Sequence, residues 1–508
     1  MTPRLFVLFV LATCALLAGA GAQSTLHIVE QNGVRDKRIN IVFLSEGYAA
    51  ADLPNFAAHV QTTVNYLFSR EPWSRYRRYC NIYRVEIASA QSGTDNGASG
   101  GTRNTWFNSG FTTPSVPQLL TFDSEGQSRA YTLLNQHVPE YDIPLLLVND
   151  TKYGGSGGAL AVASVNSSSA TILEHEIGHS FGGLADEYDI EYAAYTPRES
   201  PNATTQTNRS LVKWRAWIEP STPVPTPETG TYDAPAGVFE GAMYRISGWY
   251  RPHLNSVMQS LGRPVGQINR EQFVLSYYAA IDPLDTFTPA QTASRAVNGP
   301  QQLDFTLTPK VPTGTALQLS WLIDGQPVAG AAGPAFGLLS DRLGNGQHSV
   351  SAVVRDATPW VRNDPALSLQ SSVLWSFNLS NQLPDTIAGW RAAYGTDSGN
   401  FSGDGVSNLT KYALGIDPLR SITTAQRPAV ALSTGSPSYL TLSVPRRLRR
   451  TDVVYVPEAS ADLATWSSGP SVTTTVQDTE TMLVVRDRVA AGTGLRRYLR
   501  LRVQVVGE

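Results

Sequence analysis

The sequence predicts a mixed α/β domain followed by all-β domains. Up to about residue 290, some segments carry apolar residues at helical spacing and others are short continuous apolar runs. That combination indicates helices packed on buried strands. From about residue 300, apolar and polar residues alternate in short segments separated by Gly and Pro, which is typical of a β-sandwich. Only 16% of the residues are charged, which suits a chain rich in β-structure and turns.

The N-terminus has the pattern of a secretory signal. Arg4 gives a positive start, residues 5–17 are almost continuously apolar, and Ala20-Gly21-Ala22 supplies small residues for cleavage. The apolar run is shorter than the about 20 residues that a membrane-spanning helix needs. We therefore expect residues 1–22 to be removed and the mature protein to be secreted, either extracellular or periplasmic. No integral membrane segment is expected after signal removal.

Charge and cysteine content argue against two classes of protein. Removing the signal takes away Arg4 and no acid, so the formal net charge changes from −3 to −4. A chain so near neutrality has no electrostatic basis for binding nucleic acid. Cys14 lies in the signal, and the remaining Cys80 cannot form an internal disulfide by itself. Because Cys80 stands in an apolar-alternating stretch, we expect a buried, inert thiol.

Residues 23–292 are predicted to form the α/β domain. One helix is expected over 52–67, where Leu53, Phe56 and Val60 recur at helical spacing. Another is expected over about 168–181, after a Gly-rich loop. Short apolar runs predict strands over 37–44, 81–88 and 143–148.

The rest of the chain is predicted to form three parts. Residues 298–380 alternate like the half-buried strands of an Ig-like β-sandwich. Residues 384–425 form a short helical spacer that contains a degenerate calcium-loop pattern, and residues 427–508 return to alternating strands as a C-terminal β-domain.

The calcium-loop pattern in the spacer is incomplete. Asn400, Ser402 and Asp404 take the first, third and fifth places of the loop, and Gly405 follows correctly. Lys411 stands at the twelfth place, where calcium loops carry an acid. We therefore do not expect calcium to be a cofactor.

The second predicted helix carries His175-Glu176-Ile177-Gly178-His179. Residues four apart lie on one face of a helix, so His175 and His179 can ligate one metal ion. Imidazoles suit zinc, and two of them leave room for a third ligand and a water. Glu176 can face that water without ligating the metal. The motif therefore predicts Zn²⁺ as the cofactor and Glu176 as the general base of a hydrolase.

A third zinc ligand is expected shortly after this helix. Gly182-Gly183 can end the helix and turn the chain back. In one zinc motif a His stands six residues after the second His. Here that place holds Ala185, which cannot ligate, so Asp186 is the predicted ligand. The alternatives are Glu187, Asp189, Glu191 and Glu199.

Residues His175 to Tyr188 resemble the signature of the IgA-peptidase family of metzincin-like zinc metallopeptidases, in which Asp replaces the third His. Residues 41–48 resemble the opening strand and turn of that family, and residues 250–259 are similar to a later segment. The resemblance covers about residues 30–290. It implies a metzincin-like zincin fold followed by an Ig-like sandwich, and peptidase activity on a protein or peptide substrate.

The resemblance also implies roles for residues outside the His motif. Met258 would form an apolar floor, the Met-turn, beneath the ligands, while Gln259 stands where Arg is expected. Tyr250 is a candidate for stabilising the tetrahedral oxyanion, whereas His253 is expected at the surface. Metzincins bind substrate as an extra strand on a sheet edge, and residues 145–149, with the Gly-rich loop 154–158 after them, are the expected edge.

The sequence leaves two classes of function open. The first is a secreted zinc-dependent endopeptidase, which the intact Glu176 favours because a decayed enzyme has no chemical need for that carboxylate. The alternative is a non-catalytic extracellular adhesin or carbohydrate-binding protein on a zincin scaffold, with the C-terminal β-domains contacting a surface or a glycan. A zinc-dependent esterase or amidase would share the metal chemistry of the first.

Overall fold

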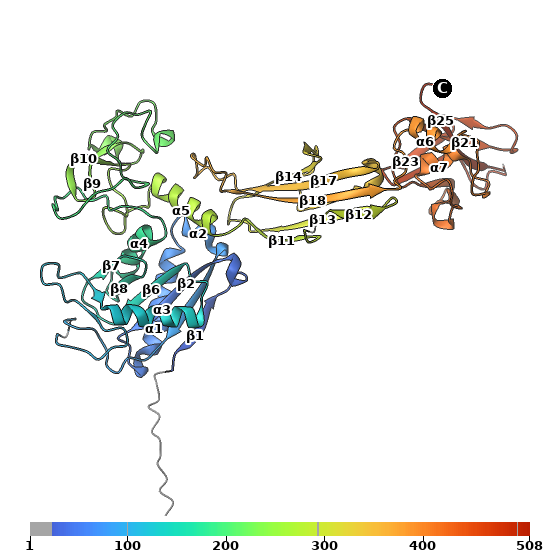
Figure 1. The fold of residues 1–508 in the computed structure, drawn as a ribbon. Helices are drawn as coiled ribbons and strands as arrows, with labels where there is room; N and C mark the ends of the chain where they lie inside the picture. The colour runs from blue at the N-terminus through green and yellow to red at the C-terminus, as the bar shows by residue number, and fades with distance from the viewer. Residues whose placement is uncertain (1–22, 99, 292–293, 495) are drawn as a thin grey trace, which may run out of the picture. The chain divides into compact units, whose positions relative to one another are not determined.

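The computed structural model describes residues 23–508 except 99, 292–293 and 495, so the predicted signal lies outside the described residues. The fold is mixed α/β with several β-sheets, as predicted (Figure 1). The chain divides into two compact units. Unit 1 comprises the described residues up to 286 with 307–319 and 353–372, and unit 2 comprises 287–306, 320–352 and 373–508.

A six-stranded sheet forms the centre of unit 1, with the order β1-β3-β2-β6-β8-β7. Adjacent strands from β3 to β8 pair in parallel, whereas β1 and β7 pair antiparallel to their neighbours. The three predicted strands are confirmed as β2, β3 and β6. The strand bounds are β1 (Thr25–Glu30), β2 (Ile39–Glu46), β3 (Cys80–Glu86), β6 (Ile143–Val148), β7 (Gly155–Ser156) and β8 (Ala161–Ser164).

Helices cover both faces of this sheet. Alternate residues of a strand point to opposite faces. Ile41 of β2 belongs to the apolar cluster that includes α1 (Leu53–Leu67) and α4 (Ser169–Ser180). Val42, the next residue, belongs to the cluster that includes α3 (Ser124–His137). Burial on both faces explains why β2 reads as a continuous apolar run. The predicted helices are confirmed as α1 and α4.

Short elements complete unit 1. The helices α2 and α5 contribute aromatic residues to the same cluster as α1 and α4. The strands β9 and β10 form a hairpin. The bounds are α2 (Trp73–Tyr76), α5 (Gln267–Ala280), β4 (Ser109–Gly110), β5 (Thr121–Phe122), β9 (Phe239–Ala242) and β10 (Arg245–Arg251).

A segment late in the chain packs inside unit 1. The buried carboxylate of Asp356 accepts hydrogen bonds from the hydroxyls of Tyr76 (2.7 Å) and Tyr278 (2.8 Å). Nearby, the ring of Trp360 lies 3.5 Å from the guanidinium carbon of Arg75. The residues around Asp356 are therefore part of the core around α2 and α5.

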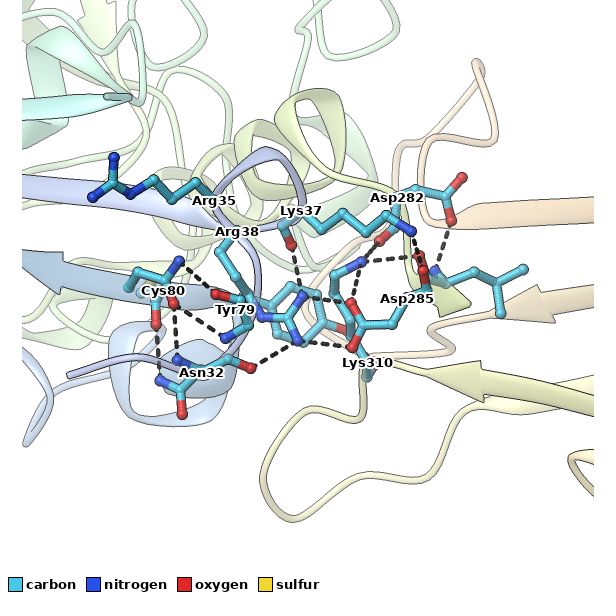
Figure 2. Close-up of polar contacts among 12 residues, drawn as sticks. Asn32, Arg35, Lys37, Arg38, Tyr79, Cys80, Asp282, Asp285 and Lys310 are labelled. Atoms are coloured by element: carbon cyan, nitrogen blue, oxygen red, sulfur yellow. Dashed lines mark hydrogen bonds and ion pairs between the residues drawn. The ribbon is translucent and has the colours of Figure 1, made fainter. Parts of the chain in front are cut away.

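A buried ionic cluster ties the start of unit 1 to its later segments (Figure 2). Arg38 donates two hydrogen bonds to the Asp285 carboxylate (2.5 and 2.7 Å) and one to the carbonyl of Asn32 (2.9 Å). Lys310 Nζ lies 3.0 Å from the same carboxylate and donates to the carbonyl of Asp282 (2.6 Å). Both cations are buried. Removing one partner of such a buried ion pair lowers the free energy of unfolding by about 3–5 kcal/mol.

The strands from residue 284 onward form the β-rich part that the alternation predicted. Two sheets come first, in the orders β11-β13-β16 and β12-β18-β17-β14-β15. Their bounds are β11 (Leu284–Thr288), β12 (Arg295–Asn298), β13 (Gln302–Pro309), β14 (Gln318–Ile323), β15 (Gln326–Pro327), β16 (Ala335–Leu339), β17 (Gly346–Arg355) and β18 (Gln370–Ser380).

Two helices and two further sheets follow. The sheets have the orders β19-β20-β24-β23 and β22-β21-β25. In the part of the chain that the structure describes, no helix is both long and apolar enough to cross a membrane. The bounds are α6 (Ile387–Tyr394), α7 (Asn408–Leu414), β19 (Ala429–Leu432), β20 (Tyr439–Pro445), β21 (Val453–Ser460), β22 (Ser467–Ser468), β23 (Thr473–Asp478), β24 (Met482–Ala490) and β25 (Tyr498–Val505).

Two expectations about single residues can be compared with this fold. Cys80 is fully buried, as predicted, and burial raises the pKa of its thiol to about 12. His253, which was expected at the surface, is buried instead. It packs on Gly266, where a Cβ would stand only 2.5 Å from the imidazole. Burial lowers the pKa of His253 to about 4.

Candidate active site

The helix α4 places the His motif at the wall of an open cleft. Ile172, Leu173 and Ile177 anchor the helix in the core of unit 1. His175, Glu176 and His179 line the cleft instead. The helix ends at Ser180, and Gly183 then adopts a left-handed backbone (φ 61°), which lets the chain turn back toward the histidines.

Three side-chain atoms converge at one point of this cleft. His175 Nε2 and His179 Nε2 are 3.1 Å apart. Asp186 Oδ1 lies 3.1 Å from the first nitrogen and 3.3 Å from the second. Ligands at about 2.0–2.2 Å from a tetrahedral zinc ion stand about 3.3 Å from one another, so the triangle has the size that zinc requires.

The hydrogen bonds of the two imidazoles direct lone pairs toward this point. His175 Nδ1 lies 2.9 Å from the carbonyl of Val257, and His179 Nδ1 lies 2.8 Å from the carbonyl of Leu184. A carbonyl only accepts, so each Nδ1 carries a proton, and in the neutral imidazole each Nε2 keeps its lone pair.

The carboxylate that completes the triangle is also an acceptor. Asp186 Oδ1 is buried and has no hydrogen-bond partner among the described residues. When both imidazoles are neutral, three acceptors face one another at this distance, and they repel unless a metal cation or a proton lies between them. The donor set therefore fits zinc.

The ionisation of these groups reflects their mutual contacts. Burial alone would lower the pKa of His179, but the Asp186 carboxylate raises it to about 9. Burial alone would raise the pKa of Asp186, but the two histidines hold it well below its usual range. For Glu176, burial raises the pKa, and the positive potential of His175 and His179 offsets only part of that rise.

Glu176 stands beside the converging atoms. One ligand atom each from His175, Glu176 and His179 lie within 4.8 Å of one another, so these three could also hold a metal ion. The shorter distances from Asp186 favour it as the third ligand and leave Glu176 free for proton transfer. The backbone of Gly157 passes against the Glu176 carboxylate, since a Cβ there would stand 2.3 Å from Oε2.

The other acids considered as ligands point elsewhere. Glu187 is fully buried and accepts hydrogen bonds from Ser256 (2.7 Å), Asn202 (2.9 Å) and Asn269 (2.9 Å). The remaining three each face a cation: Asp189 faces Arg251, Glu191 faces Arg245 and Glu199 faces Lys213. Among the predicted acids, Asp186 is the one that meets both histidines.

Met258 lies directly beneath the His motif. It is fully buried, and a Cβ on Gly178, in the middle of the motif, would stand 2.6 Å from its sulfur. The backbone N–H of Glu187 donates to the Met258 carbonyl (2.9 Å), which links the floor to the residue after Asp186. Met258 therefore packs against the helix that carries the His motif, and its role as a Met-turn stays a prediction.

Tyr250 does not line the cleft. Its hydroxyl instead faces Glu240 at 3.4 Å, on the hairpin of β9 and β10. The role predicted for Tyr250 therefore has no geometric support. The tyrosine that the sequence reasoning missed is Tyr244, which lines the cleft with its phenol next to Asp186.

An unusual turn positions Tyr244. Met243 and Tyr244 join the paired residues Ala242 and Arg245, and both have positive φ (54° and 58°). Two-residue turns of this kind normally carry Asn-Gly. Hydrogen bonds from the Met243 N–H to the Asp186 carbonyl (3.0 Å) and from the Tyr244 N–H to the Tyr188 carbonyl (3.1 Å) hold the turn. Without a Gly or Asn signal, the turn could not be recognised from sequence.

Comparison with known proteins supports the resemblance. Residues 28–233 match the IgA Peptidase M64 family. This match supports the IgA-peptidase family for that part of the chain. The matched segment contains the His motif and Asp186, so this protein is a peptidase, a hydrolase whose substrates are proteins or peptides. A search of curated proteins finds no match.

The sheet edge at the cleft agrees with the predicted one only in part. Residues 145–149 and the Gly-rich loop 154–158 were expected to form it. The loop does lie at the edge, but β6 lies inside the sheet, between β2 and β8. The edge strand is β7, and Ser156 to Gly158 line the cleft. The strands β7 and β8 follow β6 in the chain and pair on its outer side, so β6 is not the edge. The order of strands along the chain therefore does not give their order in a sheet.

The degenerate calcium loop of this peptidase contains a cation of its own. The fully buried ammonium of Lys411 lies 3.0 Å from Asp404 Oδ2 and donates to the Ser402 hydroxyl. It also donates to the carbonyl of Arg420 (2.8 Å). Lys411 thus places a positive charge among oxygens of the loop.

Proposed function

We propose that the chain is a secreted zinc-dependent endopeptidase with a metzincin-like zincin catalytic domain and an Ig-like sandwich behind it. The observation that carries the proposal is the triangle of His175 Nε2, His179 Nε2 and Asp186 Oδ1, with sides of 3.1 to 3.3 Å. Such a set of converging lone pairs suits a divalent cation and has no evident structural use. The family supplies the reaction class, which is peptide-bond hydrolysis.

The zinc ion, Glu176 and two backbone carbonyls would each have a separate part in the proposed reaction. Zinc in this site would act as a Lewis acid that acidifies water and polarises the scissile carbonyl. Glu176 takes the proton of the attacking water and passes it to the leaving amine. The carbonyls of Val257 and Leu184 keep both imidazoles in the tautomer that ligates through Nε2.

Tyr244 takes the role that sequence reasoning gave to Tyr250. Its phenol lies in the cleft next to Asp186, within the same site as Glu176. A phenol in this position can donate a hydrogen bond to the oxyanion of the tetrahedral intermediate. The backbone hydrogen bonds of the Met243–Tyr244 turn hold the phenol there before substrate arrives.

The peptide substrate would extend the sheet at β7. The outer side of Gly155 already pairs with residues 118–120. Ser156 to Gly158 line the cleft beyond it and offer backbone groups to an extended peptide. Gly157 would thereby bring the substrate backbone close to Glu176.

Export is part of the proposal on sequence grounds. Arg4, the apolar run of residues 5–17 and the small residues 20–22 have the order of a secretory signal. Expression of the full chain in a secreting host should yield a mature protein that begins near residue 23, and N-terminal sequencing of the secreted product checks this.

A cleavage assay tests the proposed reaction. The wild type should cut an unstructured protein such as casein, lose activity to a zinc chelator and regain it when zinc is added. Glu176→Ala should keep the zinc, which elemental analysis measures, but lose at least about 100-fold in kcat. Equal cleavage by Glu176→Ala, or full activity in excess chelator, would refute the mechanism. A wild type that binds zinc but cuts no peptide would favour the adhesin alternative.

A further inference from the structure

Arg198 is an unpaired cation in the wall of the cleft. It is exposed and lines the same cleft as His175, Glu176 and His179. Its guanidinium forms no hydrogen bond or ion pair with any residue that the structure describes. Among the cleft-lining residues, all of which are described, no other is an Arg or a Lys.

Three other cations of unit 1 already have partners. Lys213 pairs with Glu199 (2.7 Å) and donates to the carbonyl of Ala203 (2.7 Å). Arg245 donates to the carbonyl of Tyr195 (2.6 Å). Arg251, which is buried, donates to Glu228 (2.7 Å). Glu199, the acid next to Arg198 in sequence, is therefore already neutralised and leaves the charge of Arg198 uncompensated.

The backbone next to Arg198 is firmly attached to the active site. Asn202 accepts a hydrogen bond from the Ala185 N–H (2.7 Å) and donates one to the Ala185 carbonyl (2.9 Å). Lys213 donates to the carbonyl of Ser200 as well as to that of Ala203. Ala185 directly precedes Asp186. These hydrogen bonds therefore hold the backbone near Arg198 at a defined position relative to the predicted zinc ligand.

Three aromatic rings line the same cleft as Arg198: Tyr188, Tyr195 and Tyr244. Tyr195 interacts electrostatically with Arg198, and its ring centroid lies 4.9 Å from that of Tyr244. Tyr188 also contacts Tyr244, with their ring centroids 5.3 Å apart. Apolar ring faces exclude water, and a hydrogen bond between a guanidinium and a carboxylate strengthens where water is excluded.

We propose that Arg198 is a specificity residue, which binds a carboxylate of the peptide substrate close to the scissile bond. The inference rests on the proposed peptidase function and adds the substrate class: peptides with an acidic group beside the cleavage site. A guanidinium presents a planar fork that matches a carboxylate, so an acid should be preferred over its isosteric amide. The carboxylate can come from an Asp or Glu side chain or from the C-terminus of the substrate.

Matched peptides separate these two sources. Each peptide that the wild type cuts is compared with its Glu→Gln and Asp→Asn counterparts, and with a version whose C-terminus is amidated. We expect kcat/KM to fall about tenfold when the recognised carboxylate is neutralised. A fall on side-chain substitution assigns the contact to an acidic side chain. A fall on amidation alone assigns it to the substrate C-terminus.

Substitutions of Arg198 provide the decisive comparison. Arg198→Gln should cut the acidic and the neutral peptides at equal rates, and Arg198→Glu should prefer a Lys peptide. Arg78, which is also exposed but does not line the cleft, gives the matched control, and Arg78→Gln should keep the wild-type preference. Because Arg198 has no partner to lose, the melting temperature should stay the same in its variants.

Binding without cleavage keeps this inference separable from the proposed function. Fluorescence anisotropy on zinc-loaded Glu176→Ala should show about tenfold tighter binding of the acidic peptide, and Arg198→Gln in that background should abolish the difference. If the wild type cuts no peptide but this binding preference holds, the peptidase proposal fails and the role of Arg198 stands. An acid preference that survives Arg198→Gln, or no preference in the wild type, overturns the inference.

Discussion

At the scale of single residues, Asp186 and Glu187 stand side by side with different tasks. Asp186 faces the two imidazoles with a buried oxygen that lacks a hydrogen bond among the described residues. The carboxylate of Glu187 turns the other way and accepts hydrogen bonds from Ser256, Asn202 and Asn269. One acid is therefore assigned to the metal and the other to the loop that carries Met258.

Substitution should separate these two tasks. Asp186→Ala should lose zinc affinity by at least about 100-fold, while the melting temperature of the metal-free protein stays within a few degrees of wild type. Glu187→Ala should instead lower the melting temperature, because it leaves buried donors unsatisfied at about 1–3 kcal/mol each. Competition with a chelator measures the affinity, and calorimetry in excess chelator measures the stability. Zinc loss confined to Glu187→Ala would show that the ligand is misassigned.

His253 gives a pH-dependent contribution to stability. The backbone N–H of Gln267 donates to His253 Nε2 (3.0 Å), which requires the neutral imidazole, and Arg270 further disfavours its protonation. Burial lowers the folded pKa to about 4, below the unfolded value of about 6.5. As the pH falls, the unfolded chain therefore binds the proton at a higher pH than the folded protein does. The contribution is complete above pH 6.5 and is lost as the pH falls toward 4.

Between pH 7.5 and 5, the contribution of His253 to the free energy of unfolding should fall by about 2 kcal/mol. His253→Phe, which cannot titrate, should show a pH dependence smaller by that amount. Urea denaturation of both proteins at the two pH values measures the free energy of unfolding, and groups common to both cancel in the comparison. An identical fall in both proteins would contradict the neutral, buried state of His253.

At the scale of elements, the loop after β7 and the helix α4 meet at Gly157. A Cβ at this position would stand 2.3 Å from the Glu176 carboxylate, so Gly157→Ala must displace the proposed general base. We expect kcat/KM to fall at least about tenfold while zinc content is unchanged, since small misplacements of a catalytic group are costly. Gly230→Ala, where a Cβ meets nothing within 4 Å, is the control. Equal activity of both variants would show that the position of Glu176 is not critical.

Much of this layout could be predicted from sequence because it depends on local spacing. The four-residue spacing of His175 and His179 needs only a helix, and α4 extends from Ser169 to Ser180. Asp186 could be predicted because paired glycines limit how far the chain travels before it turns back. The continuous apolar runs likewise identified β2 and β6, since burial on both faces leaves no polar alternation.

The failures share a different physical cause. Strand order in the sheet depends on long-range pairing, so β6 could not be recognised as an interior strand. Tyr244 reaches the cleft through a turn whose left-handed residues are Met and Tyr, and tertiary hydrogen bonds rather than local preference stabilise that turn. His253 is buried because Gly266 provides space for it, a contact that pairs residues thirteen apart. The predicted domain boundaries and the roles of the site residues stay predictions.

At the scale of the whole molecule, unit 1 is discontinuous in sequence. Lys310 completes the ionic cluster around Asp285 (Figure 2), and Asp356 accepts the hydroxyls of Tyr76 and Tyr278. Lys310 and Asp356 both come after position 292, where the predicted catalytic domain ends. The unit that holds the candidate site therefore depends on segments supplied by the later, β-rich part of the chain.

Truncation should reveal this dependence. A chain of residues 23–292 keeps every candidate site residue. It removes Lys310 from the Asp285 carboxylate, and Asp356 from the hydroxyls of Tyr76 and Tyr278. We expect its melting temperature to lie at least about 10 °C below that of residues 23–380, which retain both later segments. Differential scanning calorimetry of the two forms measures the difference. Equal melting temperatures would show that the later segments are dispensable to unit 1.

The most direct test of the account is the position of the metal itself. Anomalous diffraction at the zinc edge, from crystals of the zinc-loaded protein, should give a single strong peak in the cleft. This peak should lie about 2.0–2.2 Å from His175 Nε2, His179 Nε2 and an Asp186 carboxylate oxygen. A peak at Glu187 or Glu199 instead, or no peak between the two histidines, would contradict the central claim.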